Sequence, residues 1–234
     1  MQISYEELQP LENKASLIYD TIYLNPERAR QLFDRINENI PHFFSARRLI
    51  GEDQLIVFIN PVHKRQCLIT KDNLTFDEDV GISHEIFADR LRLLSEQFCT
   101  IFQIEGVRRI GRIIRFVYPT KDVSSAHRII QQAFTKFNIE IPFDIPRLQI
   151  THRREGKNIN IHIGGTEEIG INITPNVREI REIRGISILC DINNIDTSQP
   201  QPYQKLLDDI LEFTYNYVRH ELVPFLNQYL EEVK

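Results

Sequence analysis

Apolar and polar residues alternate along much of the second half of the chain. Between 148 and 163 the apolar series is Leu148, Ile150, Ile159, Ile161 and Ile163. The polar series is Gln149, Thr151, Arg153, Asn160 and His162. Strict alternation is typical of an antiparallel sheet with one buried face and one solvated face. We therefore expect helices to cover the apolar face and the polar face to stay open to water or to a partner.

The same pattern predicts a β-hairpin. A two-residue turn at Gly156-Lys157 would place Ile150 opposite Ile163 and His152 opposite Ile161. In this register His152 and His162 lie on opposite faces of the sheet, so they cannot share a metal ion.

Apolar residues at helical spacing predict four helices. The first has Asn25 as its N-cap, begins at Pro26 and is stopped by Pro41. The others run from about Ser83 to Phe102, over 122–138 and from about Pro200 onward. Pro224 lies inside the last pattern and should interrupt that helix. Runs rich in β-branched and aromatic residues predict the strands. These are 14–24, 43–50, 54–60, 65–70, 74–76, 107–119, 146–154, 158–164, 168–174 and 185–193.

This order repeats. A strand, a helix, a meander of strands and a long helix occur twice, so the fold class is α+β with a duplicated β-α-β-β-β-(β)-α unit. The repeats are 1–105 and 106–234, which form two units or one continuous domain. We expect one curved antiparallel sheet, or two half-sheets, related by an approximate internal two-fold, with the long helices on one side.

Composition is that of an ordinary globular protein, with 41% hydrophobic and 26% charged residues. The N-terminal stretch has no basic region followed by an apolar one, and no apolar run approaches the roughly 20 residues of a membrane span. The three cysteines, Cys67, Cys99 and Cys190, are widely spaced, which predicts buried thiols rather than disulfides or a zinc site. We expect a cytoplasmic protein without membrane contact.

Charge is distributed unevenly along the chain. Residues 1–107 hold 11 Lys and Arg against 17 Asp and Glu, 108–184 hold 14 against 8, and 185–234 hold 3 against 8. The middle segment is therefore basic, at +6, within a protein of net charge −5. Most of its cations are arginines, whose planar guanidinium suits carboxylate and phosphate.

This segment supplies the candidate binding residues, which are Arg108, Arg109, Arg112, Arg115, Arg153, Arg154 and Lys157. Parity puts Arg108 and Arg112 on one face of their strand and Arg109 and Arg115 on the other. One pair then faces the helices, unless a bulge at Gly111 rotates the strand. A buried arginine needs a carboxylate, which Asp208, Asp209 or Glu212 could supply, so internal salt bridges are the alternative to a binding surface.

We identify no catalytic residue, cofactor site or metal site. The seven histidines show no metal-binding spacing. Asp191, Asn193 and Asp196 could gather oxygens around a divalent cation, but such residues also favour turns. Gly164-Gly165 resembles a fragment of a phosphate loop, but it lacks the following lysine and helix, and it also suits a hairpin connection.

Two resemblances follow from these patterns. The element order resembles the duplicated fold of TATA-box-binding protein, which implies a fold and no activity. The stretches CLITKDNLTF (67–76), RRIGRIIRF (108–116) and LCDINNID (189–196) are similar to a sporadically distributed prokaryotic family of about this length. That resemblance implies no mechanism.

The sequence leaves three functional hypotheses. The first is a non-enzymatic binding or adaptor protein that recognises an acidic protein partner or a second copy of itself. The second is a nucleic-acid-binding protein that uses the arginine-rich segment; the negative net charge and the absence of Trp count against it. The third is a small-molecule-binding protein or enzyme with a pocket between sheet and helix.

Overall fold

The computed structural model describes the backbone of residues 3–51, 55–79, 82–135, 147–174, 177–195 and 199–230. Side chains are described over the same ranges except at 79, 133–135, 168–174, 177–181 and 229–230. The predicted helix end at 136–138 and residue Asp196 lie outside the described residues.

The first half of the chain begins with a short 3₁₀ turn, Tyr5–Glu7. It continues through β1 (Gln9–Tyr19), α1 (Pro26–Asn39), β2 (Ala46–Ile50), β3 (Leu55–Asn60), β4 (Arg65–Ile69), β5 (Asn73–Asp79) and α2 (His84–Phe102). Both helices begin where the sequence predicts. The Asn25 side chain accepts hydrogen bonds from the first turn of α1, and Ser83 does the same for α2.

The second half repeats this order. It comprises β6 (Val107–Pro119), α3 (Val123–Thr135), β7 (Arg147–Arg154), β8 (Lys157–Thr174), β9 (Val177–Asn194), α4 (Tyr203–Tyr217) and α5 (Val223–Leu230). A π-helical turn, Val218–Leu222, joins α4 to α5. Pro224 cannot donate a backbone hydrogen bond, and this wider turn is how the helix accommodates the predicted interruption.

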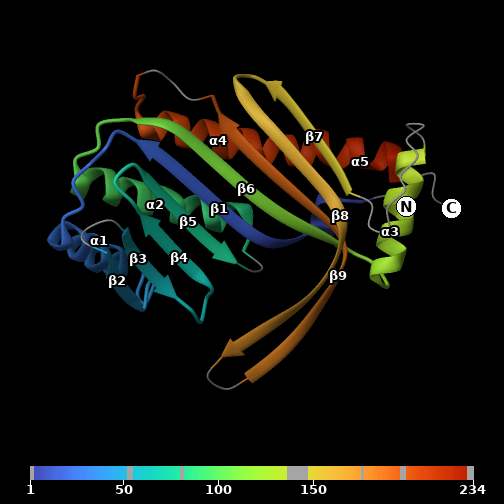
Figure 1. Ribbon diagram of the computed structural model, residues 1–234, viewed down its shortest axis with the longest axis horizontal. Helices are drawn as coiled ribbons and strands as arrows, with labels where there is room; N and C mark the ends of the chain where they lie inside the picture. Colours follow the sequence, from blue (N-terminus) through green and yellow to red (C-terminus); the bar gives the residue numbers. More distant parts are fainter. Residues whose placement is uncertain are drawn as a thin grey trace.

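The described strands form one antiparallel sheet in the order β2-β3-β4-β5-β1-β6-β9-β8-β7. The first strands of the two halves, β1 and β6, pair at its centre. On each side the last strand of a meander lies next to the first strand of the same half, and the rest of the meander runs outward (Figure 1). The two halves thus share one strand order, which confirms the duplicated unit.

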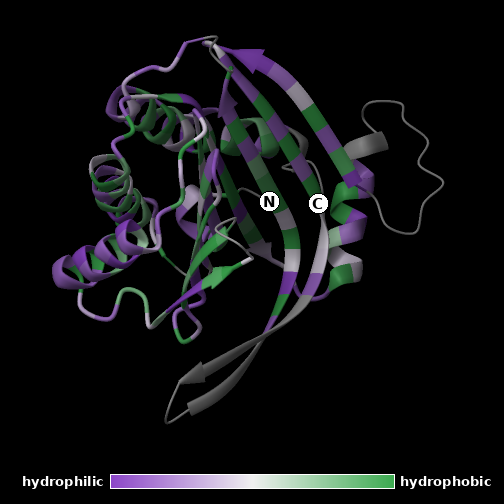
Figure 2. Cartoon of the chain, turned by 60° about the vertical axis from the view of Figure 1, so that its left-hand side comes forward, coloured by the Kyte–Doolittle hydropathy of each residue, from purple (hydrophilic) through white to green (hydrophobic). Residues whose placement is uncertain are grey.

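The helices cover one face of this sheet. α4 packs on β6 and β9, and α3 packs on β8 and β9, while α2 lies between α1 and α4 (Figure 1). Apolar and polar residues alternate along the strands (Figure 2). Ile159, Ile161 and Ile163 are buried under the helices, whereas Asn160 and His162 lie on the open face. The faces predicted from alternation are therefore correct.

The predicted hairpin register is wrong by two residues. The turn is Glu155-Gly156, with φ values of 50° and 72°, and it pairs Ile150 with Ile161 and His152 with Ile159. A turn with two positive φ angles matches the twist of a two-residue hairpin. Because a shift of two preserves side-chain parity, the face assignments survive the error.

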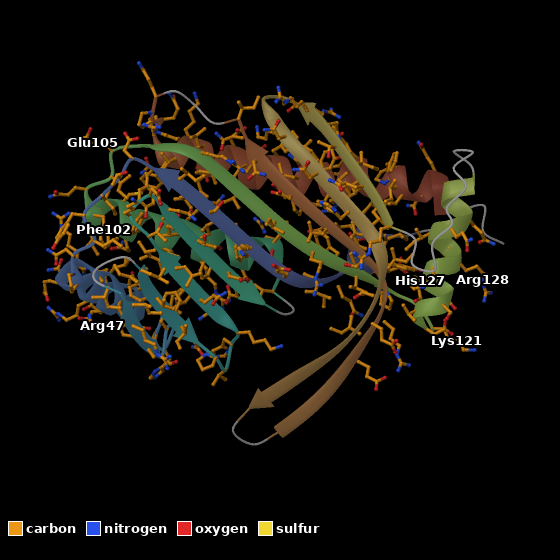
Figure 3. The ribbon with its side chains drawn as sticks, viewed as in Figure 1. Arg47, Phe102, Glu105, Lys121, His127 and Arg128 are labelled. Carbon is orange, nitrogen blue, oxygen red and sulfur yellow. The ribbon has the colours of Figure 1, made fainter. Side chains whose placement is uncertain are left out.

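Several strand boundaries also differ; for example, the predicted strand 185–193 is the end of β9, which begins at Val177. The opening strand is Gln9–Tyr19 rather than 14–24, and its pairing with β6 shifts register between Pro10 and Glu12. The predicted strands 158–164 and 168–174 are one strand, β8. Gly165 is not a turn: a Cβ on it would lie 2.2 Å from Cδ2 of His127, the α3 residue labelled in Figure 3. The glycine allows a helix to approach a strand closely.

None of the described helices is long and apolar enough to cross a bilayer.

Candidate functional site

The predicted contact residues do not gather on one surface. Arg108 pairs with Asp20, with 2.6 Å between Nη2 and Oδ1. Arg115 lies on the open face of the sheet, where its Nε is 3.8 Å from a carboxylate oxygen of Glu12 on β1. Both arginines are balanced by acidic residues of the first half of the chain.

Arg109 also lies on the open face and donates a hydrogen bond of 2.9 Å to Asn193. Asn193 in turn donates to Asp191 at 2.6 Å. Two residues of the alternative cation site therefore hydrogen-bond within a polar network on the sheet. No group of His, Cys, Asp and Glu residues suited to a metal ion occurs in the part of the chain that the structure describes.

The basic hairpin end lies against the chain's own C-terminal helix. Arg154 contacts Glu221 of the π-helical turn, and Nζ of Lys157 is 2.7 Å from Asp209 on α4. The Lys157 side chain is only 4% exposed. Arg153 is exposed on the open face. The acidic surface that complements Arg154 and Lys157 is therefore already present within the chain.

Arg112 differs from the other six. Its side chain is fully buried on the helix-covered face of β6. Nη2 donates a hydrogen bond of 3.0 Å to Oδ1 of Asn13 on β1, and the guanidinium lies 4.7 Å from the ring centre of Phe87. Nε and Nη1, which carry most of its N–H donors, have no partner among the described residues.

The sequence suggested a carboxylate for such a buried arginine. No described carboxylate lies within ion-pair distance of Arg112, and Asp208, one of those suggested, pairs with Arg92 instead. Burial lowers the pKa of Arg112 to about 9. The guanidinium is still charged at neutral pH, so a nearly uncompensated positive charge lies inside the protein.

A pocket of about 440 Å³ lies next to this charge. Asn13, the hydrogen-bond partner of Arg112, is one of its lining residues. The charge of Arg112 also acts on the pKa values of Tyr5, His84 and Glu85, and all three line the pocket. The volume falls within the roughly 300–1,000 Å³ of small-molecule sites.

The N-terminal segment forms one wall of the pocket. Ile3 is held by both amide atoms of Asn227 on α5, which accepts from its N–H at 2.7 Å and donates to its carbonyl at 2.8 Å. The Tyr5 ring packs edge-on against Phe116 and Tyr215. A few contacts with the C-terminal helix therefore hold this wall in place.

His84 contributes a second buried polar atom without a partner. Its Nδ1 makes no hydrogen bond to the described residues, and its ring lies 5.0 Å from that of Tyr215. Burial, aided by the charge of Arg112, lowers the pKa of His84 to about 3. The imidazole is therefore neutral, and it can donate one hydrogen bond without adding charge.

The arrangement is suited to binding an anion. Arg112 offers buried donors without partners, and Nδ1 of His84 is a buried ring nitrogen without a partner that donates in one of its two tautomers. Buried polar atoms in native proteins nearly always have a partner. The other charged residues of the pocket lining are Glu85, on the first turn of α2, and the pair Arg219 and Glu6, which are 3.4 Å apart. The buried charge is thus positive, whereas Arg219 and Glu6 offset each other.

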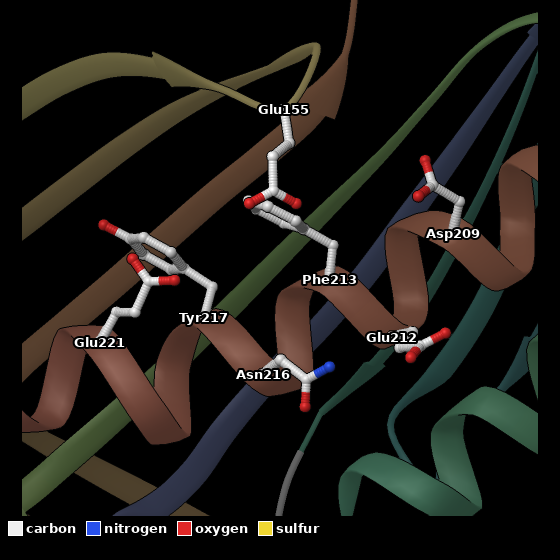
Figure 4. A pocket seen from close by; sticks show the side chains of 7 residues that line it. All are labelled: Glu155, Asp209, Glu212, Phe213, Asn216, Tyr217 and Glu221. Atoms are coloured by element: carbon white, nitrogen blue, oxygen red, sulfur yellow. The ribbon is translucent and has the colours of Figure 1, made fainter.

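A second cavity lies between the β7–β8 turn and α4 (Figure 4). Its lining includes Glu155, Glu212 and the stacked rings of Phe213 and Tyr217. Phe213 is already covered by the ammonium of Lys157, 4.7 Å from the ring centre. The cavity is acidic, and part of its charge is neutralised by the basic hairpin end.

His152 and His162 lie on opposite faces of the sheet, as the alternation predicts. His152 is on the helix side, where its Nε2 is 3.3 Å from the Tyr217 hydroxyl. The three cysteines are buried thiols, and burial raises the pKa of Cys99 and of Cys190 to about 12.

Sequence reasoning missed most of the pocket. Asn13 and His84 were not singled out, and Tyr5 lies in a segment without a strong pattern. One signal was available: Asn13 and Arg112 are polar residues at buried positions of two alternating strands.

No protein-family model matches the sequence, and no curated protein matches it. Among solved structures, the chain is similar to the TBP of Methanococcus jannaschii, with a TM-score of 0.30 and 10% sequence identity. The match covers 92% of this chain and 99% of that one.

Proposed function

We propose that this is a non-enzymatic binding protein that holds a small acidic ligand in the pocket beside Arg112. One observation carries the proposal: a fully buried guanidinium whose Nε and Nη1 have no partner among the described residues. An anion in the pocket would supply the missing charge and the missing acceptor together.

Energetics supports this proposal. Removing a charge from water costs several kcal/mol unless a partner compensates it. Among the described residues, Arg112 has one hydrogen bond, to Asn13, and lies against the face of Phe87. Groups held at such a cost are common in binding sites, where stability is given up for function.

The wider hypotheses remain proposals. An acidic protein partner, or a second copy of the chain, would have Arg153 as its most available contact, because Arg154 and Lys157 already bind the C-terminal helix. We keep nucleic acid as the weaker alternative, since the chain is acidic overall. A cytoplasmic location and membership of the sporadically distributed prokaryotic family are proposed on the sequence alone.

Binding to a panel of small molecules tests the pocket. Carboxylates, phosphate esters and sulfonates would each be compared with a neutral analogue by ligand-observed NMR and calorimetry. We expect at least one class of anion to bind, with about a tenfold or greater loss in Arg112→Gln. Arg109→Gln, on the same strand but on its open face, is the matched control. If every anion class binds the Arg112 variant as well as the unaltered protein, the pocket is not an anion site.

A further inference from the structure

We infer that the ligand is a monocarboxylate that carries an aromatic or branched apolar group. This inference rests on the proposed function and specifies the chemistry of the same pocket.

The charge of the pocket favours a single negative charge. Arg112, which lies next to the pocket through its contact with Asn13, is the one fully buried cation among the described residues, and His84 in the lining is neutral. A carboxylate balances one guanidinium and matches its planar donors. A phosphate monoester carries up to two negative charges, and its second charge would be buried near Glu85 without compensation.

The remaining lining favours an apolar body. Leu8, Ile114 and Phe116 are buried side chains of the pocket, and Ile82 and the Tyr215 ring complete this part of the lining. A cavity of about 440 Å³ is much larger than a bare carboxylate, so a ligand such as acetate would leave most of this surface uncovered. An aromatic or branched group would fill it and gain hydrophobic stabilisation.

Alternative ligands fit less well. A cationic ligand would be better matched by the acidic cavity in Figure 4, which has Glu155 and Glu212 on its walls. Among the described residues, the pocket beside Arg112 has no second buried cation that could balance a dicarboxylate. Neutral molecules would leave the guanidinium as poorly compensated as it is in the ligand-free protein.

A graded series of ligands tests the inference. The acids run from 3-methylbutyrate through 3-phenylpropionate to 3-(indol-3-yl)propionate, each with its primary amide, beside acetate and 2-phenylethyl phosphate. Dissociation constants are measured by calorimetry for the unaltered protein, Arg112→Gln, Ile82→Ser and the control Arg109→Gln.

We expect at least one acid of the series to bind about tenfold or more tightly than its amide and than acetate. Arg112→Gln should remove the preference for acid over amide, and Ile82→Ser should weaken the larger acids without affecting acetate. If the phosphate ester binds more tightly than every acid, with the same dependence on Arg112, the carboxylate inference fails while the proposed function stands. If no acid binds, the inference fails. If binding is independent of Arg112, both fail.

Discussion

Arg112 makes one side-chain hydrogen bond within the described residues. It donates to Asn13 at 3.0 Å, across the two central strands of the sheet. The two residues are 99 positions apart in the chain and belong to different repeats. Each lies at a position where alternation calls for an apolar side chain. Two polar side chains therefore lie in the middle of the core, where the two halves of the sheet meet.

Replacing Arg112 with methionine should stabilise the ligand-free protein. Because burial lowers the pKa of Arg112 to about 9, the folded state bears the full cost of the charge at neutral pH. An apolar side chain of similar length removes that cost, and we expect the free energy of unfolding to rise by about 1 kcal/mol or more. Urea denaturation measures it.

Arg109→Met is the control, since it removes a half-buried arginine that hydrogen-bonds to Asn193 on the open face, and it should bring no gain. A clear loss of stability in Arg112→Met would mean that the guanidinium supports the fold and is not held there for a ligand.

Acid should destabilise the protein through His84. Its pKa is about 3 in the folded state, against an ordinary value of 6.5. Between these two pH values the imidazole is protonated in the unfolded chain and neutral in the folded chain. This contribution to stability is complete above about pH 6.5 and is lost as the pH falls towards 3, by at most about 1.4 kcal/mol per pH unit.

The difference between the unaltered protein and His84→Gln isolates this effect. Denaturation between about pH 7.5 and 5.5, above the range where most carboxylates titrate, should show a steeper loss of stability for the unaltered protein. Parallel pH profiles for the two proteins would show that His84 is not buried in its neutral form.

The contact between α3 and β8 should respond to a single methyl group. A Cβ on Gly165 would lie 2.4 Å from Nε2 of His127, so Gly165→Ala should cost about 1–3 kcal/mol by overpacking. In a double-mutant cycle, His127→Ala should recover much of this loss. Additive losses in the cycle would place the strain elsewhere.

The two arginines at the hairpin end should behave differently on charge reversal. Arg154→Glu places a carboxylate against Glu221 and Glu155 and should lower stability by up to about 1 kcal/mol, because these pairs are partly exposed. Arg153→Glu should leave the fold intact, and it is the cleaner probe of an acidic partner.

If Arg153 contacts a partner or a second copy of the chain, Arg153→Glu should weaken that association in a salt-dependent way, as measured by light scattering and pull-down. An unchanged oligomeric state together with unchanged partners would mean that Arg153 is an ordinary solvated residue.

Local patterns in the sequence predicted the sheet and its faces. Alternation depends only on neighbouring residues, and it assigned the faces of Ile161 and His162 correctly even though the hairpin register was wrong. The same parity argument showed that some arginines of β6 must face the helices. It could not choose Arg112, because the choice depends on which face the helices cover.

The pocket itself was beyond such reasoning. It exists because Ile3 is held by Asn227, 224 residues away, and because the start of α2 lies beside the central strands. Neither contact leaves a periodic trace in the sequence. The continuity of β8 was missed for a similar reason. Gly165 suggests a turn in the sequence, and only the structure shows that a glycine is needed there because the His127 ring lies against it.

The central position of β1 affects how the chain can assemble. β1 is synthesised before the other described strands, and β5 can pair with one of its edges early, but its other neighbour, β6, follows about a hundred residues later along the chain. A first half that folds early therefore exposes an unpaired strand edge, the kind of edge that recruits strands from other molecules. During synthesis, the speed with which β6 reaches β1 should therefore affect whether β1 pairs within its own chain or with a strand of a neighbouring chain.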